Sequence, residues 1–259
     1  MDKFYLSTID ENAHLLAKKH GFGIEIAEFC TPWFLDTDFD EVDPKIREKL
    51  SCSDRFVLHA PFSELFPCAI DPKVRAIAAE RYRQVIRVAE GYGIRKIVVH
   101  GGYNPRIYFP IWYTEQSVLF WKEFLHEIPE NMVFCLENVF EEAPAMLTEI
   151  VRQVNDPRIR MCLDVGHVNA YSKVPVMKWL ESCADIVAHF HIHNNDTNRD
   201  AHGQLMDGTI PMKELLAAIE EKCPNATLTL ELMNAEPSIR WLWRNSYEKQ
   251  PCLFPESGM

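Results

Sequence analysis

Short apolar stretches rich in β-branched residues recur along the chain and alternate with segments of helical periodicity. Their spacing predicts eight strands, at residues 3–7, 23–29, 55–62, 96–103, 133–139, 160–167, 187–194 and 227–233. Between the strands, apolar positions repeat about every 3.6 residues, most clearly in residues 74–93 and 212–222. Several of these segments end in glycine, as at Gly21 and Gly93, which is typical of a helix C-terminus.

Regular strand–helix alternation indicates parallel strands joined by right-handed crossovers. We therefore predict a single α/β domain over residues 1–259, a (β/α)8 barrel. An open, doubly wound sheet is the alternative, but no GxGxxG or Walker-type loop follows the first strand, which disfavours its nucleotide-binding form. After the last strand, Trp241, Trp243 and Arg244 are expected to pack on the barrel.

The composition disfavours some partners and cellular locations for this barrel. With 27 basic and 38 acidic side chains, the net charge is −11, which disfavours nucleic acid as a partner because phosphates are neutralised by Lys and Arg. No basic segment followed by an apolar stretch opens the chain, and no apolar run is long enough to span a bilayer, so we expect neither signal peptide nor membrane contact. Eight scattered cysteines without a CxxC pair predict free thiols in a reducing cytoplasm.

Ionisable side chains lie at the C-terminal ends of most predicted strands. From the third strand onward they are His59, His100, Glu137, Asp164, His167, His191 and Glu231. The C-terminal strand ends of a (β/α)8 barrel converge on one site. No Lys or Arg occupies the last positions of strands five to eight, so the carboxylates would repel one another unless protonated or bridged by a cation. For any one residue a hydrogen-bonded strand end is an adequate explanation, but the set predicts divalent-metal binding.

The segments around these residues occur in the order found in a known superfamily. They read HAPF at 59–62, VVHGG at 98–102, LEN at 136–138, DVGH at 164–167, HFHIHNND at 189–196, RDAH at 199–202 and LEL at 230–232. Together they cover most of the chain and resemble the xylose-isomerase-like TIM barrels. That superfamily unites sugar phosphate isomerases and epimerases with the endonuclease-IV-type enzymes of AP endonuclease family 2.

The resemblance implies a central divalent metal with one ligand from each of strands five to eight. These ligands are Glu137, Asp164, His191 and Glu231. The HFH segment resembles that of ketose 3-epimerases, in which the second histidine is the ligand, and this selects His191 over His189. Three carboxylates and one imidazole suit several divalent ions, among them Mn²⁺ and Zn²⁺.

The endonuclease branch of the superfamily implies two further metal ions, making one to three in all. One would be held by His59, His100 and the shared Glu137. The other would be held by His167 and the Asp200-x-His202 segment. Histidine-rich sites of this kind prefer Zn²⁺.

Two reaction types fit such a centre. The likeness to ketose 3-epimerases implies a sugar or sugar-phosphate isomerase or epimerase, in which Glu137 and Glu231 exchange the proton of a metal-stabilised ene-diolate. The endonuclease branch implies a phosphodiesterase or abasic-site endonuclease with three zinc ions, and a Glu137 that bridges two ions would be a poor base. Dehydration of a small polyol or keto acid, and a metal- or sugar-binding barrel without activity, are further alternatives.

Four residues near the strand ends are candidates for binding a small carbohydrate, the expected partner: His193, Glu28, Trp33 and Tyr103. His193 is also a candidate base, although a solvated loop histidine is the simpler interpretation. Glu28 ends the predicted second strand. Trp33 and the aromatic loop that starts at Tyr103 could wall a pocket or pack under the barrel rim. The sequence is compatible with a homo-oligomer without establishing one.

Overall fold

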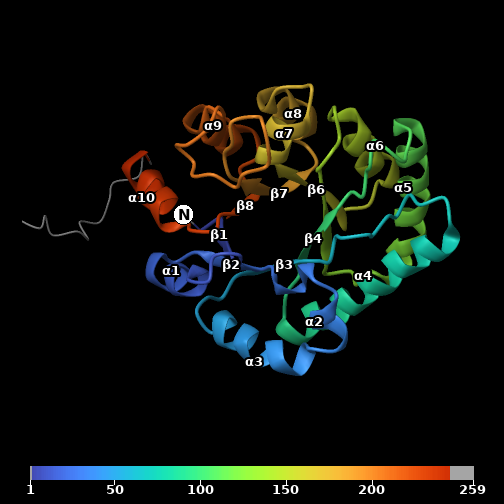
Figure 1. Cartoon of the computed structure of the whole chain (residues 1–259), viewed down its shortest axis with the longest axis horizontal. Coiled ribbons are helices and arrows are strands. Elements are labelled where there is room, and N and C mark those ends of the chain that lie inside the picture. The colour runs from blue at the N-terminus through green and yellow to red at the C-terminus, as the bar shows by residue number, and fades with distance from the viewer. Residues whose placement is uncertain (1, 246–259) are drawn as a thin grey trace, which may run out of the picture.

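A closed barrel of eight parallel strands forms the centre of the molecule (Figure 1). The computed structural model describes residues 2–245. The strands are β1 Phe4–Ser7, β2 Gly23–Ile26, β3 Phe56–His59, β4 Lys96–His100, β5 Val133–Glu137, β6 Ile159–Asp164, β7 Val187–Ile192 and β8 Thr227–Leu230. Each strand pairs with the next in sequence, and β1 pairs with β8, which confirms the predicted (β/α)8 barrel and excludes the doubly wound sheet.

Helices surround the barrel and connect its strands (Figure 1). They are α1 Ala13–His20, η1 Glu28–Cys30, α2 Trp33–Asp36, α3 Phe39–Leu50, α4 Pro72–Tyr92, α5 Pro110–Phe124, η2 Leu125–Glu127, α6 Ala145–Val154, α7 Val165–Tyr171, α8 Val176–Cys183, α9 Met212–Lys222 and α10 Glu236–Asn245. Gly21 and Gly93 adopt the left-handed conformation after α1 and α4, as their positions predict. No helix among residues 2–245 is long and apolar enough to cross a membrane.

Two apolar clusters hold this architecture together. The larger one lies between the strands and the outer helices and contains Trp121, Tyr82 and Phe134, all fully buried. A small cluster formed by Tyr5, Val57, Val98, Cys135 and Cys162 occupies part of the barrel interior. Because side chains plug the interior, the barrel is not a pore, and chemistry is confined to the ends of the strands.

All predicted strands except the first extend two or three residues past their real ends, and in three of them this changes the place of a candidate residue. The second was expected to reach Phe29, but Thr8 Oγ1 accepts the Ala27 N–H at 2.9 Å and the chain turns into η1, so Glu28 begins a short helix. The sixth was expected to reach His167, which instead lies in the first turn of α7. The Asp164 side chain caps that helix by accepting the His167 N–H, at 2.6 Å. The eighth strand ends at Leu230, one residue before Glu231.

The aromatic segment after β4 is partly helical, which corrects the expectation of a loop. Pro110 occupies the first turn of α5, where its fixed φ favours a helix start. The seven cysteines among residues 2–245 are free, as predicted, whereas Cys252 lies outside the described residues. Trp241 and Trp243 pack against the larger cluster through α10, and the Trp243 ring stacks on Phe22 with centroids 6.3 Å apart.

Candidate metal centre

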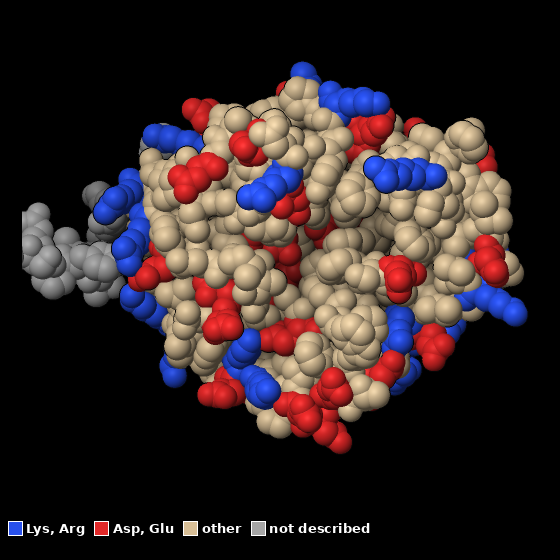
Figure 2. Space-filling model, in the orientation of Figure 1, with Lys and Arg blue, Asp and Glu red and all other residues tan. Residues whose placement is uncertain are grey.

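Four consecutive strands end on an ionisable side chain. His59, His100, Glu137 and Asp164 are the last residues of β3, β4, β5 and β6. His191 precedes the last residue of β7, and Glu231 follows β8. All of these side chains therefore reach one end of the barrel, as the sequence predicts. Figure 2 shows acidic side chains lining a hollow above the barrel, with Lys and Arg mostly toward the edge of this face.

The four residues expected to hold a central metal lie together. One ligand atom from each of Glu137, Asp164, His191 and Glu231 lies within 4.8 Å of the others. His191 Nδ1 is the common neighbour, 3.1 Å from Glu137 Oε1, 3.1 Å from Glu231 Oε2 and 3.7 Å from Asp164 Oδ2. Glu137 and Asp164 are buried, whereas the Glu231 side chain retains 14% exposure and faces the opening.

A second group gathers on the other oxygen of Glu137. His59 Nε2 lies 3.2 Å and His100 Nε2 lies 3.4 Å from Glu137 Oε2. The set whose ligand atoms come within 4.8 Å of one another is His59, Glu137 and His191, so His100 sits slightly outside it. The Phe62 ring stacks on His100 with centroids 4.3 Å apart and covers this side of the hollow.

A third group forms around Asp200. His167 Nε2 lies 3.2 Å and His202 Nε2 3.0 Å from Asp200 Oδ2, and the three residues form a compact set. His202 Nδ1 hydrogen-bonds to the Glu231 backbone carbonyl, at 2.9 Å, which ties this group to the central one. All nine residues expected as ligands thus belong to one connected cluster.

Imidazoles provide the charge compensation in this cluster. Burial alone would raise the pKa of Glu137, but His191 and His100 hold it well below its usual range. Burial likewise opposes ionisation of Glu231, yet His191 lowers its pKa to about 2. His100 is different, because burial outweighs nearby carboxylates and lowers its pKa to about 4.

The donor set fits a divalent cation. In the part of the chain that the structure describes, no Lys or Arg pairs with Glu137, Asp164, Asp200 or Glu231, and every ion pair of these carboxylates is with a histidine. Three buried atoms of this cluster also lack a hydrogen bond of good geometry and have only an ion-pair contact with another member of it: His193 Nδ1, Asp200 Oδ1 and Glu231 Oε2. Buried polar atoms without a good hydrogen bond are costly, and a shared cation would satisfy them.

His193 is fully buried, which overturns the interpretation of a solvated loop histidine. Its Nε2 lies 3.1 Å from Asp164 Oδ2, and its ring stacks on His202 with centroids 4.1 Å apart. Gly166 makes this position possible, because a Cβ there would lie 1.9 Å from the His193 ring. The structure therefore places His193 between the central and third groups.

The contacts of Glu28 and Tyr103, two of the other candidate substrate-binding residues, are with residues outside the ligand cluster, and the third, Trp33, is largely exposed. Glu28 accepts hydrogen bonds from Thr8 Oγ1 at 2.6 Å and from Lys49 Nζ at 2.5 Å, so its carboxylate already has partners. Trp33 lies in α2 and is 68% exposed. Tyr103 is buried, and its ring packs against Tyr113 at 5.0 Å.

Sequence reasoning missed two residues that support the cluster. Asn138 joins β5 to β6, because its amide donates to Asp164 O at 3.0 Å and accepts from Asp164 N at 2.9 Å. Its place beside Glu137 in the LEN segment was the available signal. Glu25 lies inside the barrel beneath His191, at 1% exposure. A lone acidic residue in the apolar stretch GIEI was its signal.

A family model described as "Xylose isomerase-like TIM barrel" matches residues 15–247 of the chain. This match covers strands β2 to β8 and every residue of the ligand cluster. The chain belongs to the xylose isomerase-like TIM barrel family. The resemblance carried by the short segments is thereby confirmed at the level of the family.

Members and neighbours of the xylose isomerase-like family differ in their described activities. A "Probable endonuclease 4" of Ureaplasma parvum is 28% identical over 190 residues, which cover 64% of this chain and 61% of that protein. A solved D-tagatose 3-epimerase-like protein aligns with a TM-score of 0.76 and 22% identity, covering 94% of this chain and 96% of the other. An IOLI protein solved with a bound zinc atom aligns with a TM-score of 0.72 and 17% identity, covering 94% and 96%. At these identities the two structures establish the shared fold.

Proposed function

We propose that this xylose isomerase-like barrel is a divalent-metal-dependent isomerase or epimerase of a sugar or sugar phosphate. One observation carries the proposal. Glu137, at the end of β5, and Glu231, the residue after β8, approach the same atom, His191 Nδ1, to 3.1 Å each. A small polyol bound at this point would have a carboxylate on each side, which is the arrangement that proton transfer between two faces of a carbon requires.

In this proposal Glu137, Asp164, His191 and Glu231 hold the ion. A bound divalent cation would supply Lewis-acid stabilisation of the negative charge that develops on the substrate oxygens. Both glutamates are ionised at neutral pH, because neighbouring imidazoles lower their pKa values. Inversion would need one of them ionised, to accept the proton from the carbon beside a sugar carbonyl, and the other protonated by solvent beforehand, to deliver a different proton to the opposite face.

The two glutamates are not equivalent. Glu137 has four imidazole partners, whereas Glu231 has an ion pair with His191 alone. Positive neighbours favour the ionised carboxylate and weaken it as a base. We therefore assign the proton abstraction to Glu231, which is also the more exposed, and the delivery of a separate proton to the opposite face to a protonated Glu137.

Three further features support a small carbohydrate substrate. The hollow is lined by acidic side chains, which repel a phosphate backbone, and the net charge of the chain is −11. The Phe62 ring beside His100 is 39% exposed and offers an apolar face to a sugar. The D-tagatose 3-epimerase-like neighbour has a barrel of the same kind over 94% of this chain.

Deuterium exchange tests the proposal. Purified protein loaded with Mn²⁺ or Co²⁺ is incubated in D2O with a panel of ketoses and ketose phosphates, and deuterium on carbon is measured by NMR. We expect metal-dependent incorporation that Glu231→Gln and Glu137→Gln each abolish. Glu142→Gln is the control, because this rim carboxylate pairs with Lys173 and lies outside the cluster. Absence of exchange from every ketose tested would contradict the proposal.

A phosphodiesterase is the second candidate, and one observation favours it. All nine residues expected for a trinuclear centre are present and connected, and a probable endonuclease 4 is among the relatives. Three tightly held zinc ions per chain together with cleavage of an oligonucleotide at an abasic site would establish this activity instead.

A further inference from the structure

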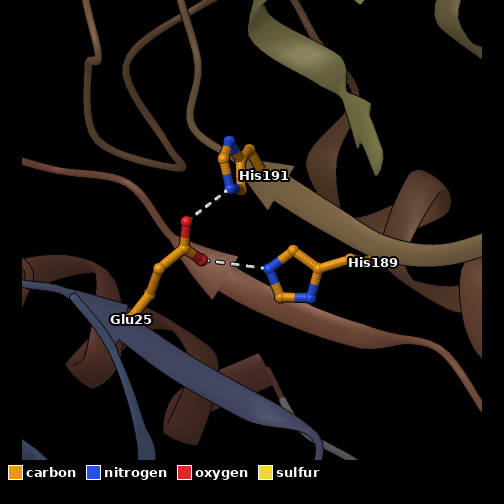
Figure 3. A group of neighbouring side chains, drawn as sticks. All are labelled: Glu25, His189 and His191. Carbon is orange, nitrogen blue, oxygen red and sulfur yellow. Dashed lines mark hydrogen bonds and ion pairs between the residues drawn. The ribbon is translucent and has the colours of Figure 1, made fainter. Parts of the chain in front are cut away.

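A column of hydrogen-bonded side chains runs through the barrel interior beneath the candidate metal ligands. Glu25 lies at its centre: its Oε1 is 2.9 Å from His191 Nε2, and its Oε2 is 3.0 Å from His189 Nε2 (Figure 3). Thr229 Oγ1 also donates to Glu25 Oε2. All four side chains are at most 1% exposed.

The column continues to the opposite end of the barrel. His189 Nδ1 lies 2.6 Å from Thr227 Oγ1, and Lys96 Nζ donates to the same oxygen at 2.6 Å and to Ala188 O at 3.0 Å. The buried carboxylate of Glu25 and the Lys96 ammonium are thereby joined through two neutral groups. Such a closed network leaves no coordinating atom free, so Glu25 and His189 are poor candidates for a metal site of their own.

Donors and acceptors can be assigned along the whole column. Lys96 has only donors, so Thr227 Oγ1 accepts from it and is free to donate its own hydrogen to His189 Nδ1. His189 then carries its proton on Nε2 and donates it to Glu25. An ionised carboxylate only accepts, so His191 must also carry a proton on Nε2.

This assignment fixes what His191 presents to the ligand cluster. With Nε2 protonated and held by Glu25, Nδ1 is the nitrogen whose lone pair His191 would offer to a metal ion. Nδ1 is the atom that lies 3.1 Å from both Glu137 and Glu231. In the metal-free protein a proton on Nδ1 compensates these two carboxylates, and a bound divalent ion would take the place of that proton.

We infer that Glu25 is a positioning residue for metal binding: it holds the His191 ring in place, selects the tautomer that directs Nδ1 at the ion, and increases the basicity of that nitrogen. The inference rests on the proposed metal-dependent function. Carboxylate partners of metal-binding histidines act in this way, and their loss lowers metal affinity about 10–100-fold. Glu25 lies on β2 and His191 on β7, two strands that are not neighbours in the barrel, so the contact crosses the barrel interior.

Two substitutions separate charge from shape. Glu25→Gln keeps the volume and can still accept from His191 through its amide oxygen, but it removes the negative charge. Glu25→Ala removes both the charge and the acceptor. We expect the dissociation constant for Zn²⁺, measured by competition with a chromogenic chelator, to rise about tenfold in the first variant and about a hundredfold in the second.

Asp10→Asn provides the matched control. Asp10 is another buried carboxylate, 3% exposed, and it accepts from Asn12 N at 2.9 Å and Ala235 N at 2.8 Å, with no ligand residue among these partners. We expect this variant to have a lower free energy of unfolding than the wild type and an unchanged Zn²⁺ affinity. The absorption spectrum of the Co²⁺-loaded protein gives a second readout, which we expect to shift in Glu25→Gln at full occupancy and to stay unchanged in Asp10→Asn.

The outcomes distinguish this inference from the proposed function. If the wild-type protein binds Zn²⁺ and Glu25→Gln binds it with the same affinity and the same Co²⁺ spectrum, the positioning role is wrong and the metal enzyme stands. If the wild-type protein binds no divalent cation, the proposed function itself is wrong. If Glu25→Ala does not fold, the comparison of Glu25→Gln with the wild type still decides the question.

Discussion

The charge balance of the candidate metal centre makes the metal-free protein sensitive to pH, and His202 gives the cleanest measurement of this effect. Burial alone would lower the pKa of His202, but the hydrogen bond to Asp200 and the charge of Glu231 raise it from 6.5 to about 9. The folded state therefore binds this proton more tightly than the unfolded chain does. The stabilisation is fully present below pH 6.5 and is lost as pH rises through about 9.

The size of the effect follows from the pKa change. Each pKa unit corresponds to about 1.4 kcal/mol, and the His202 side chain is 25% exposed, so solvent screening leaves about 2–3 kcal/mol. We expect the free energy of unfolding of chelator-treated wild-type protein to fall by at least this amount between pH 6.5 and 9.5. Urea unfolding at a series of pH values measures it directly.

His202→Gln isolates the contribution of this one group. At pH 6.5 the variant should be about 2–3 kcal/mol less stable than the wild type, and the difference should vanish near pH 9.5. His126→Gln, which changes an exposed histidine of η2, serves as the control and should follow the wild-type curve. Parallel pH profiles for wild type and His202→Gln would show that Asp200 and Glu231 do not hold a proton on His202, and the charge balance described above would be wrong.

Three other substitutions test the packing and the ligand set. Gly166→Ala places a Cβ 1.9 Å from the His193 ring and should cost about 1–3 kcal/mol in urea unfolding, whereas Gly91→Ala meets nothing within 4 Å in α4 and should be neutral or stabilising. Trp121→Ala empties a fully buried site in the larger apolar cluster and should lower the free energy of unfolding by about 3–5 kcal/mol. Asp164→Asn should lower the metal content of dialysed protein measured by mass spectrometry, and unchanged content would remove Asp164 from the central site.

The barrel and the strand-end members of the candidate ligand cluster could be predicted because both follow from periodic features of the sequence, whereas Asp200 and His202 came only from the resemblance to the family. Apolar runs recur at strand spacing, and parallel strands in a barrel bring their C-terminal ends together. His59, His100, Glu137 and Asp164 needed only this rule to be placed at one site. The position of an ionisable residue at a strand end is therefore readable from the sequence.

The contacts inside the site could not be predicted from the sequence, because they form between strands that are distant in the chain. Glu25 occupies the middle of a four-residue strand, and only the closed barrel shows that its side chain meets His191 from the other side of the interior. His193 is buried because Gly166 leaves room for its ring, a contact between residues 27 positions apart. The sequence predicted His167 to lie on a strand, whereas it lies in α7. The start of this helix depends on the Asp164 side chain accepting the His167 N–H, which leaves no periodic pattern in the sequence.

Metal content per chain tests the central claim most directly. The purified protein, loaded with Mn²⁺ or Zn²⁺ and dialysed, is analysed for metal beside His191→Ala, which removes the common neighbour of the proposed ligands Glu137, Asp164 and Glu231. We expect one firmly bound divalent ion in the wild type and its loss in the variant. Three tightly held zinc ions would favour the phosphodiesterase over the isomerase, and a wild-type protein that retains no divalent ion would contradict the metal centre itself.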